Sequence, residues 1–230
     1  MNDKIYFLIP ITALIFSSCS NSNSGSEQTS SNPEIEKVKE LNASGRENAP
    51  PVTGKKYDLK SGIITFETIS EMSGTKVAPV KKIIYFDDYG TKECAETYND
   101  GKLKETFFSD GKNLFMLYHG DKIAVNSGSA YQGTEMLFDW SQVSQKDKDA
   151  GMAKQGEKET VAGKECETFT FITQTAGAKT TTKYAGWDHI VLSMELSSKD
   201  MTSTTKAVKI EENVPVPADK FSVPADYKVQ

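Results

Sequence analysis

The chain has 230 residues, 26% of them charged, and a formal net charge of −5 at pH 7. A mildly acidic chain with interspersed signs lacks the basic face that nucleic acid requires. It also lacks the basic surface that docks on anionic lipid headgroups. We therefore expect no nucleic acid partner and no electrostatic binding to membranes.

The first nineteen residues have the pattern of an export signal that ends at a cysteine. Lys4 gives a positive start, residues 5–16 form an apolar run, and small residues precede Cys19. The run is too short to cross a bilayer, which takes roughly 20 residues. The arrangement resembles a bacterial lipoprotein signal, so we predict a signal peptide over 1–18 and a lipid anchor on Cys19. The alternative is an ordinary cleaved signal with a chance cysteine.

Residues 19–56 are expected to be a tether between this anchor and a folded domain. Residues 20–32 have no apolar side chain and cannot offset the entropy of ordering. Residues 34–41 have helical spacing, but an isolated helix of this length is marginal, so we interpret them as solvated. Two prolines at 50–51 then precede a single domain, which we predict over 57–230.

Within that domain the dominant hydrophobic period is two, which indicates β-strands. The clearest runs cover residues 62–70, 80–87 and 188–197, and further strand signals fall at 159–161, 166–173, 180–185 and 201–210. Glycine with Asn or Asp separates neighbouring runs, as tight hairpins require. The chain is therefore predicted to be mainly β, an antiparallel meander.

One stretch, between residues 130 and 156, lacks this alternation. Four apolar residues recur there at helical spacing, namely Met136, Leu137, Trp140 and Val143. Asp139 and Gln142 have the spacing of a capping box. We predict one short helix here, followed by a polar loop over residues 145–156.

The strands around residues 107–118 are apolar on both faces, so both faces must be covered. The body of the sheet supplies one cover, and the helical segment at 136–143 is a candidate for the other. Two alternatives follow: ordinary two-layer packing, or a sheet and helix that enclose a cavity for an apolar ligand.

Apart from Cys19, the chain contains Cys94 and Cys166, both in predicted strands. Export to an oxidising compartment makes them a candidate disulfide pair. Two buried free thiols are the alternative, because sequence does not show whether the two residues approach each other.

No catalytic pattern emerges from the remaining residues. The two histidines, His119 and His189, lie far apart in the sequence, and no Cys or His cluster has zinc spacing. The Gly-x-Ser-x-Gly pattern of a nucleophile elbow is absent from the predicted domain. We expect no metal, no cofactor and no enzymatic activity.

Several stretches together resemble LolA-type proteins and related exported lipoproteins: the meander, the Trp-bearing insert, TVAGKECETFTF, Gly186-Trp187 before DHIVLSMEL, and PADKFSVPADYKV. The resemblance implies a curved antiparallel sheet or incomplete β-barrel with a short helical lid and an apolar cavity for acyl chains. It implies cavity and lid positions at six residues: Phe107, Phe115, Leu117, Met136, Phe138 and Trp140.

The sequence thus predicts a membrane-anchored envelope lipoprotein that binds a lipid or lipidated ligand without catalysis. The alternative is an envelope protein-interaction or sensor module with a filled core, whose protein partner the sequence does not name. Uncharged residues 20–23 after the anchor favour the periplasmic side of the outer membrane over the cell surface.

Overall fold

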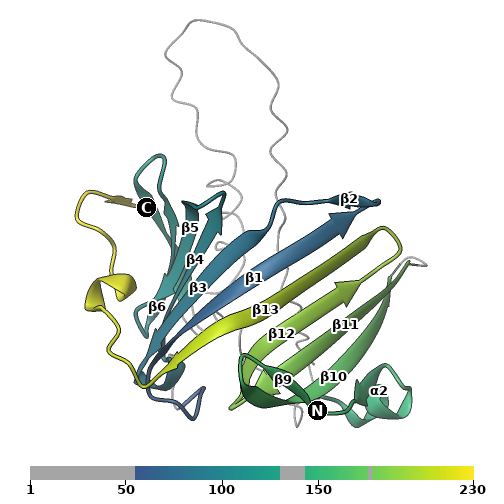
Figure 1. The fold of residues 1–230 in the computed structure, drawn as a ribbon. Coiled ribbons are helices and arrows are strands. Elements are labelled where there is room, and N and C mark those ends of the chain that lie inside the picture. Colours follow the sequence, from purple (N-terminus) through teal and green to yellow (C-terminus); the bar gives the residue numbers. More distant parts are fainter. Residues whose placement is uncertain (1–54, 130–142, 176–177) are drawn as a thin grey trace, which may run out of the picture.

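The computed structural model describes residues 55–129, 143–175 and 178–230 of the chain. These residues form one large, open, curved sheet with very few helical residues (Figure 1). The predicted mainly β fold class is therefore confirmed, and the sheet is not closed into a barrel.

Two meanders make up this sheet. The first contains β3 (Val80–Asp87), β4 (Lys92–Asn99), β5 (Lys102–Ser109), β6 (Asn113–Tyr118) and β7 (Ile123–Ser129). The second contains β10 (Lys164–Thr175), β11 (Ala178–Trp187), β12 (Ile190–Ser197) and β13 (Met201–Glu212). The strands follow the runs of period two, and the turns between them contain the expected glycines.

The two meanders are joined by β1 (Gly62–Met72), which lies between β3 and β13. Gly62 pairs with Phe86 on one side and with Glu212 on the other, and both pairings are antiparallel. Three short strands complete the sheet: β2 (Thr75–Lys76) pairs with β1, and β8 (Ala153–Gln155) and β9 (Glu159–Val161) pair with β10. β1 thus sits at the centre of the sheet.

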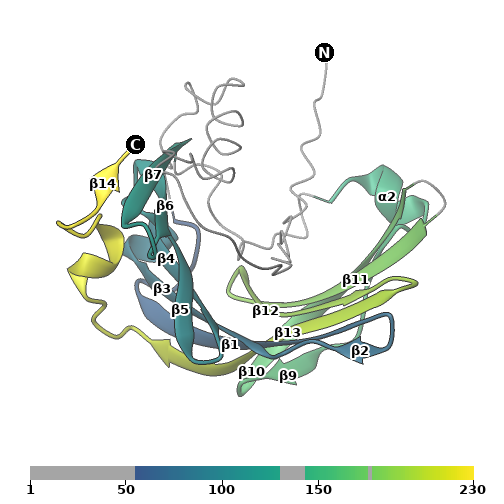
Figure 2. The ribbon, with the colours of Figure 1, turned by 90° about the horizontal axis from the view of Figure 1, so that it is seen from above.

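Seen from above, the sheet curves like a trough (Figure 2). β1, β13 and β12 form the floor, β3–β7 rise as one arm, and β10 and β11 rise as the other. Register shifts interrupt the ladder near Phe66, Tyr98, Phe115 and Gly186. Irregularities of this kind add twist and bend the strands locally.

Residues 214–230, which we call the strap, cover the outside of the first arm (Figure 2). The strap contains a short 3-10 helix, η4 (Ala218–Phe221), and β14 (Lys228–Val229), which pairs in parallel with β7. Phe221 is buried in a cluster with Cys94, Phe108 and Leu117. The proline-rich end of the chain is therefore a second layer on the convex face.

The described α-helix, α2 (Gln145–Asp149), lies where a polar loop was expected. Ser144 is its N-cap, and the Ser144 side chain accepts a hydrogen bond from the backbone N–H of Asp147. This local cap stabilises one helical turn without any apolar stripe, which explains why a search for apolar periodicity misses it. Of the helix predicted at 136–143, residues 136–142 lie outside the described residues, and Val143 lies in a bend.

Among the described residues, no helix is both long enough and apolar enough to span a membrane.

Candidate functional site

A row of apolar side chains crosses the concave face of the first arm. Directly paired residues of neighbouring strands share a face of the sheet. The pairing register therefore places six residues in one line across six strands: Ile64, Ile84, Ala95, Phe107, Met116 and Val125. We call this line the apolar row. At about 4.8 Å per strand it is about 24 Å wide.

The position of the strap shows on which face of the sheet the apolar row lies. The residues between those of the row, such as Cys94 and Phe108, lie in the cluster under Phe221. Because the strap lies outside the curve, the apolar row must line its inside (Figure 2).

The second arm also has apolar residues on the concave face. Thr68 shares a face with Ile64 on β1, and its partner Thr205 pairs with Met194, which in turn pairs with Tyr184. Phe171 meets Tyr184 edge to face, with ring centroids 5.7 Å apart. The inside of the trough is therefore apolar on both arms.

Burial varies across the concave face, and in the first arm Ile84 of β3 and Val125 of β7 are buried. Ile64 and Phe66 are fully buried at the centre of the sheet. Seven apolar side chains are half-buried, five on the arms and two on β12: Phe107, Leu114, Met116, Phe171, Tyr184, Met194 and Leu196. Both arms and β12 therefore present partly accessible apolar surface, whereas β1 does not at Ile64 and Phe66.

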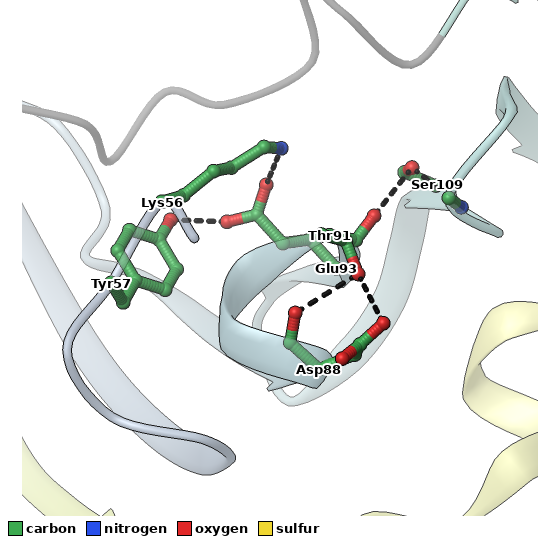
Figure 3. A network of polar contacts seen from close by, with 7 residues as sticks. Lys56, Tyr57, Asp88, Thr91, Glu93 and Ser109 are labelled. Atoms are coloured by element: carbon green, nitrogen blue, oxygen red, sulfur yellow. Dashed lines mark hydrogen bonds and ion pairs between the residues drawn. The ribbon is translucent and has the colours of Figure 1, made fainter. Parts of the chain in front are cut away.

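A polar cluster around Glu93, which lies two residues from Ala95 in β4, is next to the apolar row; Figure 3 shows its contacts. Glu93 shares the concave face with Phe86 and Ser109, and its side chain is 10% exposed. The Tyr57 hydroxyl donates a hydrogen bond to one carboxylate oxygen, and the Lys56 ammonium lies 3.3 Å from the other. Burial, reinforced by the Glu93 charge, raises the pKa of Tyr57 well above its ordinary value.

This cluster fixes where the chain enters the sheet. The backbone N–H groups of Lys56 and Tyr57 both donate to the Tyr89 carbonyl oxygen, at 2.9 and 3.2 Å. The Tyr57 ring packs edge to face on Phe86, 5.1 Å between centroids, and also lies against Gly90. A phenol this deeply buried and protonated is suited to structure rather than to acid–base chemistry.

The predicted cavity residues do not share one face. Phe107 lies in the apolar row, whereas Phe115 and Leu117 lie on the opposite face, packed beneath the strap. Met136, Phe138 and Trp140 lie outside the described residues. Sequence reasoning missed Met116 and Leu114, although the Asp110-Gly111 turn gave the signal: folding the hairpin there places Met116 opposite Phe107.

Cys94 and Cys166 are both buried free thiols. They sit in β4 and β10, which five other strands separate in the sheet, and no disulfide joins them. Burial raises the pKa of the Cys94 thiol to about 12, so it is protonated and unreactive at neutral pH. Of the two open alternatives, the free thiols are the one observed.

The two histidines also lie apart. His119 bridges the Thr106 hydroxyl and the Tyr227 hydroxyl, at 2.9 and 2.7 Å, and so joins the sheet to the strap. His189 lies in an exposed turn, 3.7 Å from Asp58. The described part of the chain contains no group of three or more His, Cys, Asp or Glu side chains arranged to hold a metal ion.

A scan against protein-family models and a search of curated proteins each found no match. Solved structures with a similar fold do exist. One is a conserved protein from Thermus thermophilus, described as uncharacterized, with 11% identity, a TM-score of 0.49, and coverage of 86% of this chain and 97% of that one.

A LolA superfamily protein from Nitrosomonas europaea has 7% identity, a TM-score of 0.38, and coverage of 82% and 97%. The lipoprotein LppX from Mycobacterium tuberculosis has 10% identity, a TM-score of 0.37, and coverage of 82% and 100%. The expected resemblance to LolA-type proteins is thus found among solved structures. At these identities and TM-scores it gives no information about function.

Proposed function

We propose that this protein is an envelope lipoprotein that binds the acyl chain of a lipid or a lipidated molecule on its concave face. It acts without catalysis and is held at the membrane through Cys19, on the periplasmic side of the outer membrane. Residues 19–56 tether the folded domain over 57–230 to this anchor.

The observation that carries the proposal is the apolar row on the inside of a curved sheet. The strap already covers the outside of the same arm, and within the row Ile64, Ile84 and Ala95 belong to the core cluster while Val125 is buried, so its accessible part is Phe107 and Met116. Phe107 and Met116 are half-buried and face the second arm, where Phe171 and Tyr184 are also apolar. A concave apolar surface with few polar groups at its edge is the usual form of a site for an apolar ligand.

A substitution on the row tests the proposal. Met116→Lys places a charge on the concave face, and we expect uptake of a fluorescent fatty acid to fall at least tenfold, because a lysine there must be desolvated by the ligand. Val208→Lys is the matched control: Val208 is 50% exposed, lies outside the row, and should bind as the unmodified chain does. Equal uptake by both variants, with no lipid seen by native mass spectrometry, rules the proposal out.

The anchor is tested separately. Intact mass spectrometry of the chain purified from membranes should show loss of residues 1–18 and the added mass of acyl chains on Cys19. An acyl-free chain that retains its first eighteen residues contradicts the anchor and the localisation, but leaves binding on the concave face intact.

A second function is favoured by one observation: the centre of the concave face is filled. Ile64, Phe66, Ile84 and Phe86 are all buried. An envelope protein-interaction or sensor module with a packed core has this property. It predicts no lipid uptake in the test above, together with a protein recovered by crosslinking in the envelope.

A further inference from the structure

The strap consists of two consecutive units with the same sequence start. Residues 216–219 and 223–226 both read Val-Pro-Ala-Asp. In each unit the proline begins a turn: the backbone N–H of Lys220 donates to the Pro217 carbonyl oxygen at 3.1 Å, and that of Tyr227 donates to the Pro224 carbonyl oxygen at 3.0 Å. We call residues 216–222 the inner unit and residues 223–230 the outer unit.

The inner unit is held by buried contacts. Lys220 forms an ion pair with Glu96, whose side chain is 7% exposed, and its ammonium lies 4.4 Å from the centroid of the Tyr85 ring. The Tyr98 hydroxyl donates to Glu96 at 2.7 Å. Phe221 is buried among the apolar side chains of β4 and β5. Release of this unit exposes a desolvated charge and an aromatic side chain together.

The outer unit is held by more exposed contacts: Val223 and Tyr227 pack, only partly buried, against the cluster around Phe221, and its remaining contacts are open to water. Lys122 and Asp226 form an ion pair at 2.7 Å, with side chains 60% and 59% exposed. The only strand in this unit, β14, has two residues, lies at the edge of the sheet, and includes Val229, which is 61% exposed. Exposed ion pairs and short edge pairings stabilise a structure weakly.

The two units are nevertheless not interchangeable. The fifth residue of each unit makes the central polar contact, and it is Lys220 in one and Tyr227 in the other. Lysine fits the Glu96 carboxylate, whereas tyrosine fits the His119 ring, 2.7 Å from its hydroxyl oxygen. The surface around His119 and Lys122 therefore specifically accepts an outer unit.

We propose that the outer unit exchanges between two copies of this chain. The outer unit of one copy leaves the edge of β7 while its inner unit stays docked, and it pairs with β7, His119 and Lys122 of the second copy. The exchanged contacts are the same as those made within one chain, so the two arrangements differ chiefly in the linker at residues 222–224 and in the cost of association. Exchange consequently increases with protein concentration.

This surface requires no ligand on the concave face, so the inference stands or falls independently of the proposed function. The occupant is fixed by complementarity: an extended segment with an acidic residue for Lys122 and a phenol for His119, which each copy of the chain carries at 226–227.

Isotope mixing tests the exchange without any substitution. Chains labelled with ¹⁴N and with ¹⁵N are mixed in equal amounts over a series of concentrations. A carbodiimide then joins amines to carboxylates in existing ion pairs, and the joined peptides are examined by mass spectrometry. The exposed Lys158–Glu165 ion pair is the matched control, at 2.7 Å with side chains 54% and 71% exposed.

We expect joined Lys122–Asp226 peptides that contain one labelled and one unlabelled partner, in a share that rises with concentration towards the half set by random pairing. Joined Lys158–Glu165 peptides should remain unmixed. The inference is overturned if Lys122–Asp226 peptides stay unmixed at every concentration. Equal mixing at both ion pairs also overturns it, because that result reports nonspecific collision.

Discussion

Phe107 and Phe108 are neighbours in β5 but lie on opposite faces of the sheet and serve different surfaces. Phe108 stacks on Phe115, with ring centroids 5.0 Å apart, beneath the strap. Phe107 lies between Ala95 and Met116 in the apolar row, on the concave face. A single strand therefore supports both the outer layer and the candidate binding surface. Substitutions at Phe107 and Phe108 can test the two faces separately.

Phe108→Ala should lower the free energy of unfolding by about 3–5 kcal/mol, because it leaves a cavity in a packed cluster. Phe107→Ala should cost only about 1–2 kcal/mol, since its ring is half-buried. Urea denaturation measures both values. Uptake of a fluorescent fatty acid should show the reverse order, with the larger loss for Phe107→Ala. Equal stability losses would contradict the assignment of the two faces.

Lys220→Met should lower the free energy of unfolding by about 2 kcal/mol, because it leaves the buried Glu96 carboxylate without its cation. The comparison variant is Lys158→Met, which removes two exposed ion pairs, with Glu165 and Glu167, and should change stability by less than about 0.5 kcal/mol. Urea denaturation of both variants is the measurement. A loss for Lys220→Met no larger than that for Lys158→Met would show that the strap does not depend on this ion pair.

The docking of the strap should weaken in acid. Burial alone would raise the pKa of Glu96, but hydrogen bonds from Lys220, Tyr98 and Tyr85 outweigh it and hold this pKa below its ordinary value. A lowered folded-state pKa contributes stability that is complete above the unfolded value of about 4.3 and is lost as pH falls through the folded value.

Amide hydrogen exchange of residues 214–230, followed from pH 6 downwards at matched intrinsic rates, reports this loss. The pKa of Asp226 is also lowered, by its hydrogen bond with Lys122, so the outer unit loosens in the same range. The Glu96→Gln variant separates the contribution of Glu96 from that of Asp226. In this variant the amides of the inner unit should already exchange faster at pH 6, and their exchange rates should change less with pH. If the unmodified chain and the Glu96→Gln variant show the same pH dependence, the loosening in acid does not come from Glu96.

Gly90→Ala should destabilise the chain more than Gly101→Ala does. Both glycines have positive φ, +81° and +73°, so both substitutions carry the cost of the left-handed region, about 1–2 kcal/mol. Only at Gly90 does the new methyl group also meet a ring, since a Cβ there would lie 2.6 Å from Tyr57, whereas nothing lies within 4 Å at Gly101. Displacement of Tyr57 should add about 1–3 kcal/mol through its lost hydrogen bond to Glu93. Urea denaturation compares the pair, and equal losses would contradict a tightly packed Tyr57.

The strands and hairpins of this protein could be predicted because the information is local. Period-two runs and glycine turns predicted β1, β3, β5, β6 and β10–β13, and the alternation already placed Phe107 and Phe108 on opposite faces. The helix at 136–143 was predicted from local periodicity in the same way. The helix α2, in contrast, depends on one capping serine, and a pattern of apolar residues does not reveal it.

What the sequence by itself determined, then, is which residues extend, where they turn and which alternate side chains share a face. Only the tertiary structure decided that β1 pairs with β13, that the sheet bends into a trough, and that the strap covers the Phe115 and Leu117 face so that Phe107 lines the inside. The reason is physical: backbone dihedral preferences act within a few residues, whereas pairing and layer choice depend on burying surface between segments more than a hundred residues apart.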